Sequence, residues 1–114
     1  MTTTTTEFAP ADRYLYDFGL CSLSNGWAQI DTRQDASYFG TWIHPEKRLI
    51  FCYCEGDTTL TQSETDEELV AEFKKIDAWN LENFNQGAKI DPGWNHDNEI
   101  AQRLKAAGLG EYLH

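Results

Sequence analysis

The 114-residue chain lacks the segments that direct a protein into or across a membrane. No apolar run approaches the roughly 20 residues that a transmembrane helix needs. Residues 1–6, a methionine and five threonines, contain neither the basic region nor the apolar stretch of a signal peptide. Three cysteines, an odd number in a chain without an export signal, predict reduced thiols and no structural disulfide. We therefore expect a cytoplasmic protein with no membrane association.

Basic residues are also scarce. Nine Lys and Arg stand against 19 Asp and Glu, which gives a net charge of -10 and a pI near 4.5. Affinity for DNA or RNA depends on cationic contacts with phosphates, so this composition excludes direct nucleic-acid binding. A field of this sign attracts basic surfaces and speeds association with them. The charge favours a basic partner protein, although acidity also serves solubility alone.

Motifs of the common nucleotide, cofactor and nucleophile sites are absent: there is no Walker loop, no G-x-G-x-x-G and no G-x-S-x-G. Cys52 and Cys54 would share one face of a strand, where His44 or His96 would have to complete a zinc site. Structural zinc sites usually present two pairs at C-x2-4-C and H-x3-5-H spacing, whereas the three histidines here, His44, His96 and His114, are scattered. Two buried cysteines are the better interpretation, and we predict no metal and no cofactor.

Two small-enzyme hypotheses stay open beside a non-enzymatic function. Cys54 could act as a nucleophile if the fold brings His96 close to it. Three carboxylates near strand ends could hold a magnesium ion for phosphodiester cleavage: Asp31, Asp35 and Asp57. No lysine stands at a nuclease-like spacing from them, and Asp35 and Asp57 are better explained as turn residues that hydrogen-bond their own backbone. The chain is therefore predicted not to be an enzyme.

The composition is that of one folded domain. Hydrophobic residues make up 40% of the chain and aromatic residues 13%, which is unlike a disordered protein. The length suits a single core. We expect residues 1–12, which include the threonine run, to be a flexible tail, and residues 13–114 to form one α+β domain.

The first half of the domain has the pattern of strands. We expect strands over residues 27–32, 37–44, 48–54 and 58–62, and a short strand or packed arm over residues 13–18. Pro45 marks a turn between the second and third strands. The third is the most hydrophobic run in the chain, so it is predicted to be central. The result is a small antiparallel β-meander of three to four strands.

The second half has the pattern of two helices packed on one face of that sheet. Thr65 and Glu68 fit a capping box, so a helix begins there, and it should end near residues 83–87. Its apolar stripe consists of Leu69, Val70, Phe73, Ile76 and Asn80. Asn95 is predicted to cap a second helix, which Gly108 ends in a Schellman motif. The stripe of that helix consists of Ile100, Leu104 and Ala107.

The first predicted helix carries the candidate partner-binding site. Glu64, Glu68 and Glu72 recur every four residues, about 6 Å apart along one edge, where like charges repel. The full set of candidate residues is Glu64, Glu67, Glu68, Glu72, Asp77 and Glu82. A row of carboxylates resembles a string of phosphates, and the alternative is a solvated helix surface.

Four short segments resemble small uncharacterised proteins of bacteriophages, plasmids and proteobacterial genomes. They are Gly-Trp-Ala-Gln-Ile-Asp-Thr, Gln-Asp-Ala, Gly-Thr-Trp and Cys-Glu-Gly-Asp, at residues 26–32, 34–36, 40–42 and 54–57. The resemblance spans about residues 17 to 77. Such mobile-element proteins are often compact inhibitors of host defence, anti-CRISPR proteins being the best known, and several of these mimic nucleic acid. The resemblance implies an inhibitor that occupies a basic nucleic-acid-binding site of a host protein or nucleoprotein complex.

Aromatic residues support an alternative to binding through the acidic residues. The strands carry Trp27, Phe39, Trp42, Phe51 and Tyr53. Base stacking by these rings would need surrounding cations, which are few here, so core packing explains them better. A protein of a mobile element that binds through an aromatic surface, as an accessory or regulatory factor or as a homodimer, remains the second hypothesis.

Overall fold

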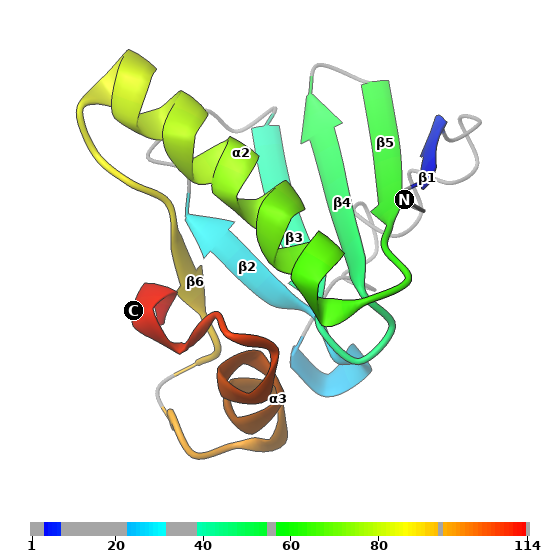
Figure 1. The fold of residues 1–114 in the computed structure, drawn as a ribbon, viewed down its shortest axis with the longest axis vertical. Coiled ribbons are helices and arrows are strands. Elements are labelled where there is room, and N and C mark those ends of the chain that lie inside the picture. The colour runs from blue at the N-terminus through cyan, green and yellow to red at the C-terminus, as the bar shows by residue number, and fades with distance from the viewer. Residues whose placement is uncertain (1–3, 8–22, 32–38, 55–56, 94, 114) are drawn as a thin grey trace.

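The computed structural model describes residues 4–7, 23–31, 39–54, 57–93 and 95–113. A six-stranded antiparallel sheet is covered on one face by two helices, which confirms the predicted α+β class (Figure 1). The strand order is β1-β5-β4-β3-β2-β6. The strands are β1 (Thr4–Glu7), β2 (Ala28–Asp31), β3 (Phe39–His44), β4 (Leu49–Cys54), β5 (Asp57–Gln62) and β6 (Lys89–Asp91). The helices are α2 (Asp66–Phe84) and α3 (Glu99–Ala107), with 3-10 turns η2 (Leu23–Asn25) and η3 (Gly110–Tyr112).

Strands β2 to β5 form the predicted meander, with β4 between β3 and β5. Side chains alternate between the two faces of the sheet. In β2, Ala28 and Ile30 are buried while Gln29 is exposed. The pair Ile43 and Ile50, opposite each other on β3 and β4, belongs to the core that the helices cover.

Two edge strands extend the meander beyond the prediction. β1 pairs with β5 from Thr4 opposite Gln62 to Glu7 opposite Thr59, so the prediction of a flexible tail is wrong for residues 4–7. Threonine is β-branched and suits a strand even in a low-complexity run. β6 pairs with β2 and was not predicted, because three residues are too few to show periodicity. The predicted arm over residues 13–18 lies outside the described residues.

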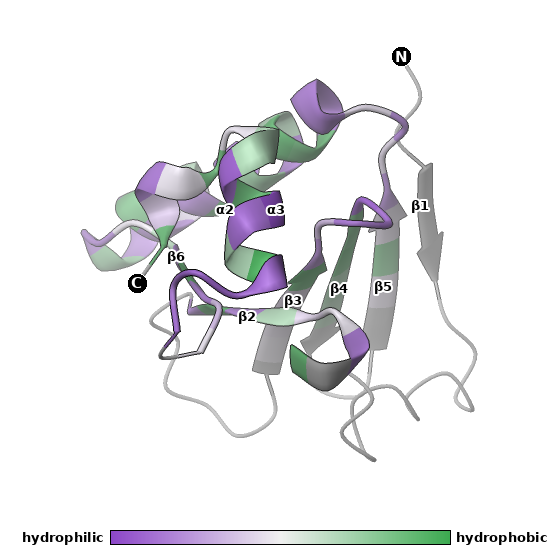
Figure 2. Cartoon of the chain, turned by 90° about the horizontal axis from the view of Figure 1, so that it is seen from below, coloured by the Kyte–Doolittle hydropathy of each residue, from purple (hydrophilic) through white to green (hydrophobic). Residues whose placement is uncertain are grey.

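Helix α2 begins and ends where the sequence predicts. The Glu68 N–H donates to Thr65 Oγ1 at 3.2 Å, and Glu68 Oε1 accepts from the Thr65 N–H at 3.3 Å, which confirms the capping box. Asn85 ends the helix in the left-handed conformation, with φ of 56°. Of the predicted stripe, Leu69, Phe73 and Asn80 are fully buried. Figure 2 shows α2 and α3 on the same side of the sheet.

The start of α3 differs from the prediction by one turn. Asn98, not Asn95, is the N-cap, and its Oδ1 accepts from the Ala101 N–H at 2.8 Å. Asn95 Oδ1 instead accepts from the Asp97 N–H, which places it in the preceding turn. Both asparagines suit a cap, so residue type alone does not distinguish them. The end of α3 is the predicted Schellman motif, with Gly108 at φ 98° and a 2.9 Å hydrogen bond from the Leu109 N–H to the Leu104 carbonyl.

A second apolar cluster lies on the face of the sheet opposite the helices. Trp27 and Phe51 form its buried centre, 6% and 0% exposed. Trp42, Leu49 and Leu60 pack against them. Core packing is therefore confirmed for Trp27 and Phe51. Within the described residues, no helix combines the length and apolarity that crossing a membrane requires.

Candidate functional site

Three of the six candidate carboxylates project from α2 and its N-terminal flank into solvent. Glu64, Glu67 and Glu82 are exposed. Among the described residues, their carboxylates take part in no ion pair or side-chain hydrogen bond. At 1.5 Å per residue, Glu67 and Glu82 lie about 22 Å apart along the helix axis. We call Glu64, Glu67 and Glu82 the outer carboxylates.

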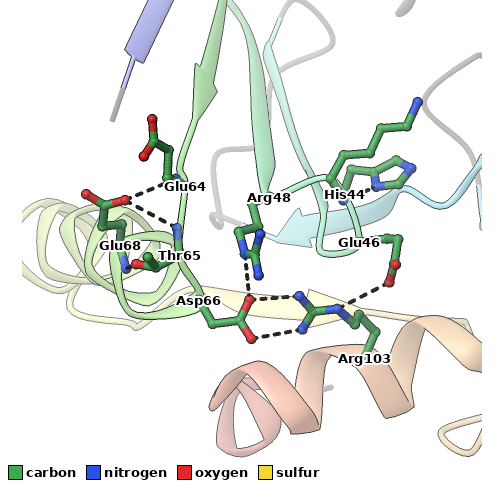
Figure 3. Close-up of polar contacts among 9 residues, drawn as sticks. His44, Glu46, Arg48, Glu64, Thr65, Asp66, Glu68 and Arg103 are labelled. Carbon is green, nitrogen blue, oxygen red and sulfur yellow. Dashed lines mark hydrogen bonds and ion pairs between the residues drawn. The ribbon is translucent and has the colours of Figure 1, made fainter. Parts of the chain in front are cut away.

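The other three candidates are engaged in contacts within the fold. Glu68 completes the capping box and also accepts from the Glu64 N–H at 3.0 Å (Figure 3). Glu72 Oε2 lies 2.8 Å from Lys75 Nζ, and the Glu72 side chain is 18% exposed. Asp77 Oδ1 accepts from the Ala88 N–H at 2.9 Å, which ties α2 to the segment before β6. The sequence groups Glu64, Glu68 and Glu72 by helical spacing and adds the other three as further negative charge, whereas the contacts divide the six residues into three exposed and three engaged ones.

Asp66 forms an ionic cluster that sequence reasoning missed. Its carboxylate contacts Arg103 at 2.7 Å and Arg48 at 2.9 Å, while Glu46 lies 3.3 Å from Arg103 (Figure 3). Hydrogen bonding by Arg103 lowers the pKa of Asp66, despite the opposing effect of burial. The same hydrogen bond raises the pKa of Arg103. The cluster joins the start of α2, α3 and the turn between β3 and β4, so two of the few cations are already neutralised.

A pocket of about 330 Å³ lies between α2 and strands β3 to β5. The sheet lines it with Thr41, Ile50, Cys52, Thr59 and Thr61, and α2 with Glu72, Lys75, Ile76, Trp79 and Asn80. The helical residues recur at intervals of three and four, which is one flank of a helix. The threonine content of residues 58–62 is the sequence feature that accompanies this pocket, but by itself it predicts only a strand.

The zinc hypothesis finds two of its candidate ligands, His44 and Cys52, on opposite faces of the sheet. His44 packs edge-on against Trp27, with ring centroids 5.2 Å apart, and its Nδ1 accepts from the Lys47 N–H at 3.1 Å in the turn after β3. Burial lowers the pKa of His44. Cys52 was predicted to be buried but is only partly buried, because it lines the pocket under α2 on the opposite face, where its Sγ lies 3.8 Å from Thr41 Oγ1. The side chain of Cys54 lies outside the described part of the structure, so the hypothesis of a Cys54 nucleophile with His96 stays a prediction.

The magnesium hypothesis also finds no common site. Asp31 ends β2 and Asp57 begins β5, with β3 and β4 between them in the sheet. Three strand spacings put the two backbones roughly 14 Å apart, which is too far for one ion. Asp35 lies outside the described residues. Over the described ranges, no group of three or more His, Cys, Asp or Glu residues could hold a metal ion.

Comparisons with known proteins add no assignment. No protein-family model, no curated protein and no solved structure matches the chain.

Proposed function

We propose that this chain is a non-enzymatic acidic binding protein that occupies the basic nucleic-acid-binding site of a host protein or nucleoprotein complex, in the manner of an anti-CRISPR inhibitor. The observation that carries the proposal is the set of outer carboxylates. Glu64, Glu67 and Glu82 are exposed and lack counter-ions among the described residues. The Lys and Arg side chains of a basic groove that contact phosphates can contact these carboxylates instead, and the negative field of the chain steers it toward such a groove.

The charges on α2 predict which substitutions weaken partner binding and which strengthen it. Lys74 is also exposed on α2, between Glu67 and Glu82 in sequence. A cation there weakens the field that a basic partner meets. Removing Lys74 should therefore strengthen binding, whereas neutralising the outer carboxylates should weaken it.

The experiment is displacement of fluorescent duplex DNA from purified CRISPR effector complexes of proteobacteria, measured at low and high salt. The wild-type chain should displace the DNA. The variant Glu64→Gln, Glu67→Gln, Glu82→Gln should do so at least tenfold less well, with a slower association rate and a shallower salt dependence.

A matched variant separates a local site from net charge. Asp97→Asn, Glu99→Gln, Glu111→Gln removes the same three charges from exposed positions in α3 and its flanks. It should act within threefold of wild type, and Lys74→Gln should act more strongly than wild type. Equal weakening by both triple variants, or no displacement by the wild-type chain, would contradict the proposal.

One observation favours the second function, an accessory or regulatory protein of a mobile element that binds through an aromatic surface or as a homodimer. At the C-terminal end of α2, Trp79, Leu81 and Phe84 are 47%, 51% and 40% exposed. The rings of Trp79 and Phe84 lie 5.5 Å apart in an edge-to-face arrangement. Sedimentation equilibrium tests this function: a dimer that Phe84→Glu dissociates, with unchanged stability, would support it.

A further inference from the structure

The pocket beneath α2 exists because the sheet presents short side chains there. Thr41, Cys52 and Thr59 lie opposite one another on β3, β4 and β5, and Thr61 lies beside Ile50 in the next cross-strand row. Four of these five side chains are smaller than the Leu, Ile and Phe that normally fill the space between a helix and a sheet. The result is a pocket of about 330 Å³, at the lower end of the range for ligand sites.

The pocket lining has both apolar and hydrogen-bonding groups. Ile50, Ile76 and the indole of Trp79 provide apolar walls. Trp79 lines the pocket and is 47% exposed, so part of this side chain faces solvent. The hydroxyls of the threonines and the fully buried amide of Asn80 can both donate and accept. A ligand that fits has a flat apolar body and an edge that also both donates and accepts.

The charges at the pocket favour a neutral ligand. Glu72 and Lys75 are its ionic lining residues, and they neutralise each other at 2.8 Å. An anion or a cation would have to break this pair to obtain a counter-charge. The net charge of -10 further disfavours anions.

We propose that this pocket binds a small uncharged aromatic molecule that carries an amide or lactam edge. This site is separate from the outer carboxylates, so it adds a small-molecule ligand to a chain whose proposed function is protein binding. The ring lies between Trp79 and the sheet, and the amide faces the threonine hydroxyls and Asn80.

The test is an NMR titration of the full chain with benzamide and, as the charged molecule of the same shape, benzoate. Benzamide should shift the backbone amide signals of the pocket residues in a saturable way. Benzoate should bind at least tenfold more weakly. Absence of saturable shifts with benzamide, or equal binding of benzoate, would overturn the proposal.

Variants locate the site. Trp79→Ala should weaken benzamide binding at least fivefold, whereas Leu81→Ala, equally exposed on the same helix but outside the pocket lining, should stay within twofold. Cys52→Leu, which fills the pocket from the sheet, should abolish binding while the remaining spectrum keeps the dispersion of the folded chain.

If Trp79→Ala and Leu81→Ala act alike, or if Cys52→Leu binds as well as wild type, the ligand is elsewhere and the proposal fails. Because none of these variants changes an outer carboxylate, DNA displacement from the effector complexes tests the proposed function independently.

Discussion

The two sides of α2 meet the same sheet through different side chains. Toward β2, β3 and β6, large apolar residues fill the space, namely Ile30, Ile43 and Ile90 from the sheet and Leu69, Phe73, Leu104 and Leu109 from the helical layer. Toward β4 and β5, threonines and Cys52 leave the pocket. One amphipathic helix therefore produces a close-packed core on one flank and a cavity on the other, according to the volume of the strand residues beneath it.

We call the side of α2 toward β2, β3 and β6 the filled side. The C-terminal segment packs on this side as a further layer. Tyr112 of η3 packs on Phe73, with ring centroids 4.6 Å apart, and burial raises the pKa of its phenol. Leu113 forms an isolated bridge with Ile90 of β6. The C-terminal segment thus stabilises the filled side, and we expect substitutions there to cost far more than substitutions at the pocket.

The largest effect is expected for Phe73→Ala. Phe73 is fully buried in the filled side, and truncating a buried Phe lowers the free energy of unfolding by about 3 to 5 kcal/mol. Urea denaturation measures this loss, with Ile76→Ala for comparison. Ile76 lines the pocket and is only partly buried against the core, so about 1 to 2 kcal/mol is expected. Equal losses from both variants would contradict the difference between the two sides.

Enlarging a side chain should destabilise the filled side and stabilise the chain at the pocket. Ala28 is fully buried, so Ala28→Leu should overpack the filled side and cost about 1 to 3 kcal/mol. Cys52→Leu adds volume where a pocket exists and should stabilise the chain by about 0.5 to 1 kcal/mol. Thermal denaturation of both variants under one set of conditions measures the contrast, and a destabilised Cys52→Leu variant would show that the pocket closes in solution.

Local signals in the sequence predicted the elements that depend on neighbouring residues. The capping box at Thr65 and the Schellman ending at Gly108 each join groups within five residues of one another, and successive members of the apolar stripe of α2 are at most four residues apart. The alternation in β2 and the central position of β4 follow from periodicity and hydrophobicity in the same way.

Long-range pairing determined what the sequence did not predict. β1 and β6 are strands because β5 and β2 offer them open edges, and neither run has a pattern of its own. The division of the six acidic residues depends on partners such as the Ala88 N–H, which is 11 residues from Asp77. The pocket depends on three strands and a helix at once, so no single window of sequence contains it.

An intermediate effect is expected for Asp66→Asn, which removes the charge that joins the filled side to the turn before β4. The loss should be about 1 to 2 kcal/mol, less than for a fully buried charge because the Asp66 side chain is 33% exposed and solvent screens it. The pKa of Asp66 in the folded state is below its usual value of 3.8, so its contribution is complete above that value and disappears as the pH falls through the lowered pKa. Urea midpoints from pH 7 down to pH 2 should therefore converge for wild type and variant at the acidic end. A constant difference across that range would contradict the role of the charge.

The smallest effect concerns His44, on the face opposite the pocket. Burial, and secondarily the charge of Lys47, lowers the pKa of this imidazole below 6.5, so the folded chain holds it neutral where the unfolded chain protonates it. The stability from the neutral ring is complete above pH 6.5 and is lost as the pH falls toward the lowered pKa. We expect the urea midpoint of wild type to fall modestly between pH 8 and pH 5. His44→Asn keeps an acceptor near the Lys47 N–H but does not titrate, so its midpoint should be lower at pH 8 and change less with pH. The difference between the two pH profiles isolates His44 from the other histidines, and parallel profiles would show that this ring is equally protonated in the folded and unfolded chains.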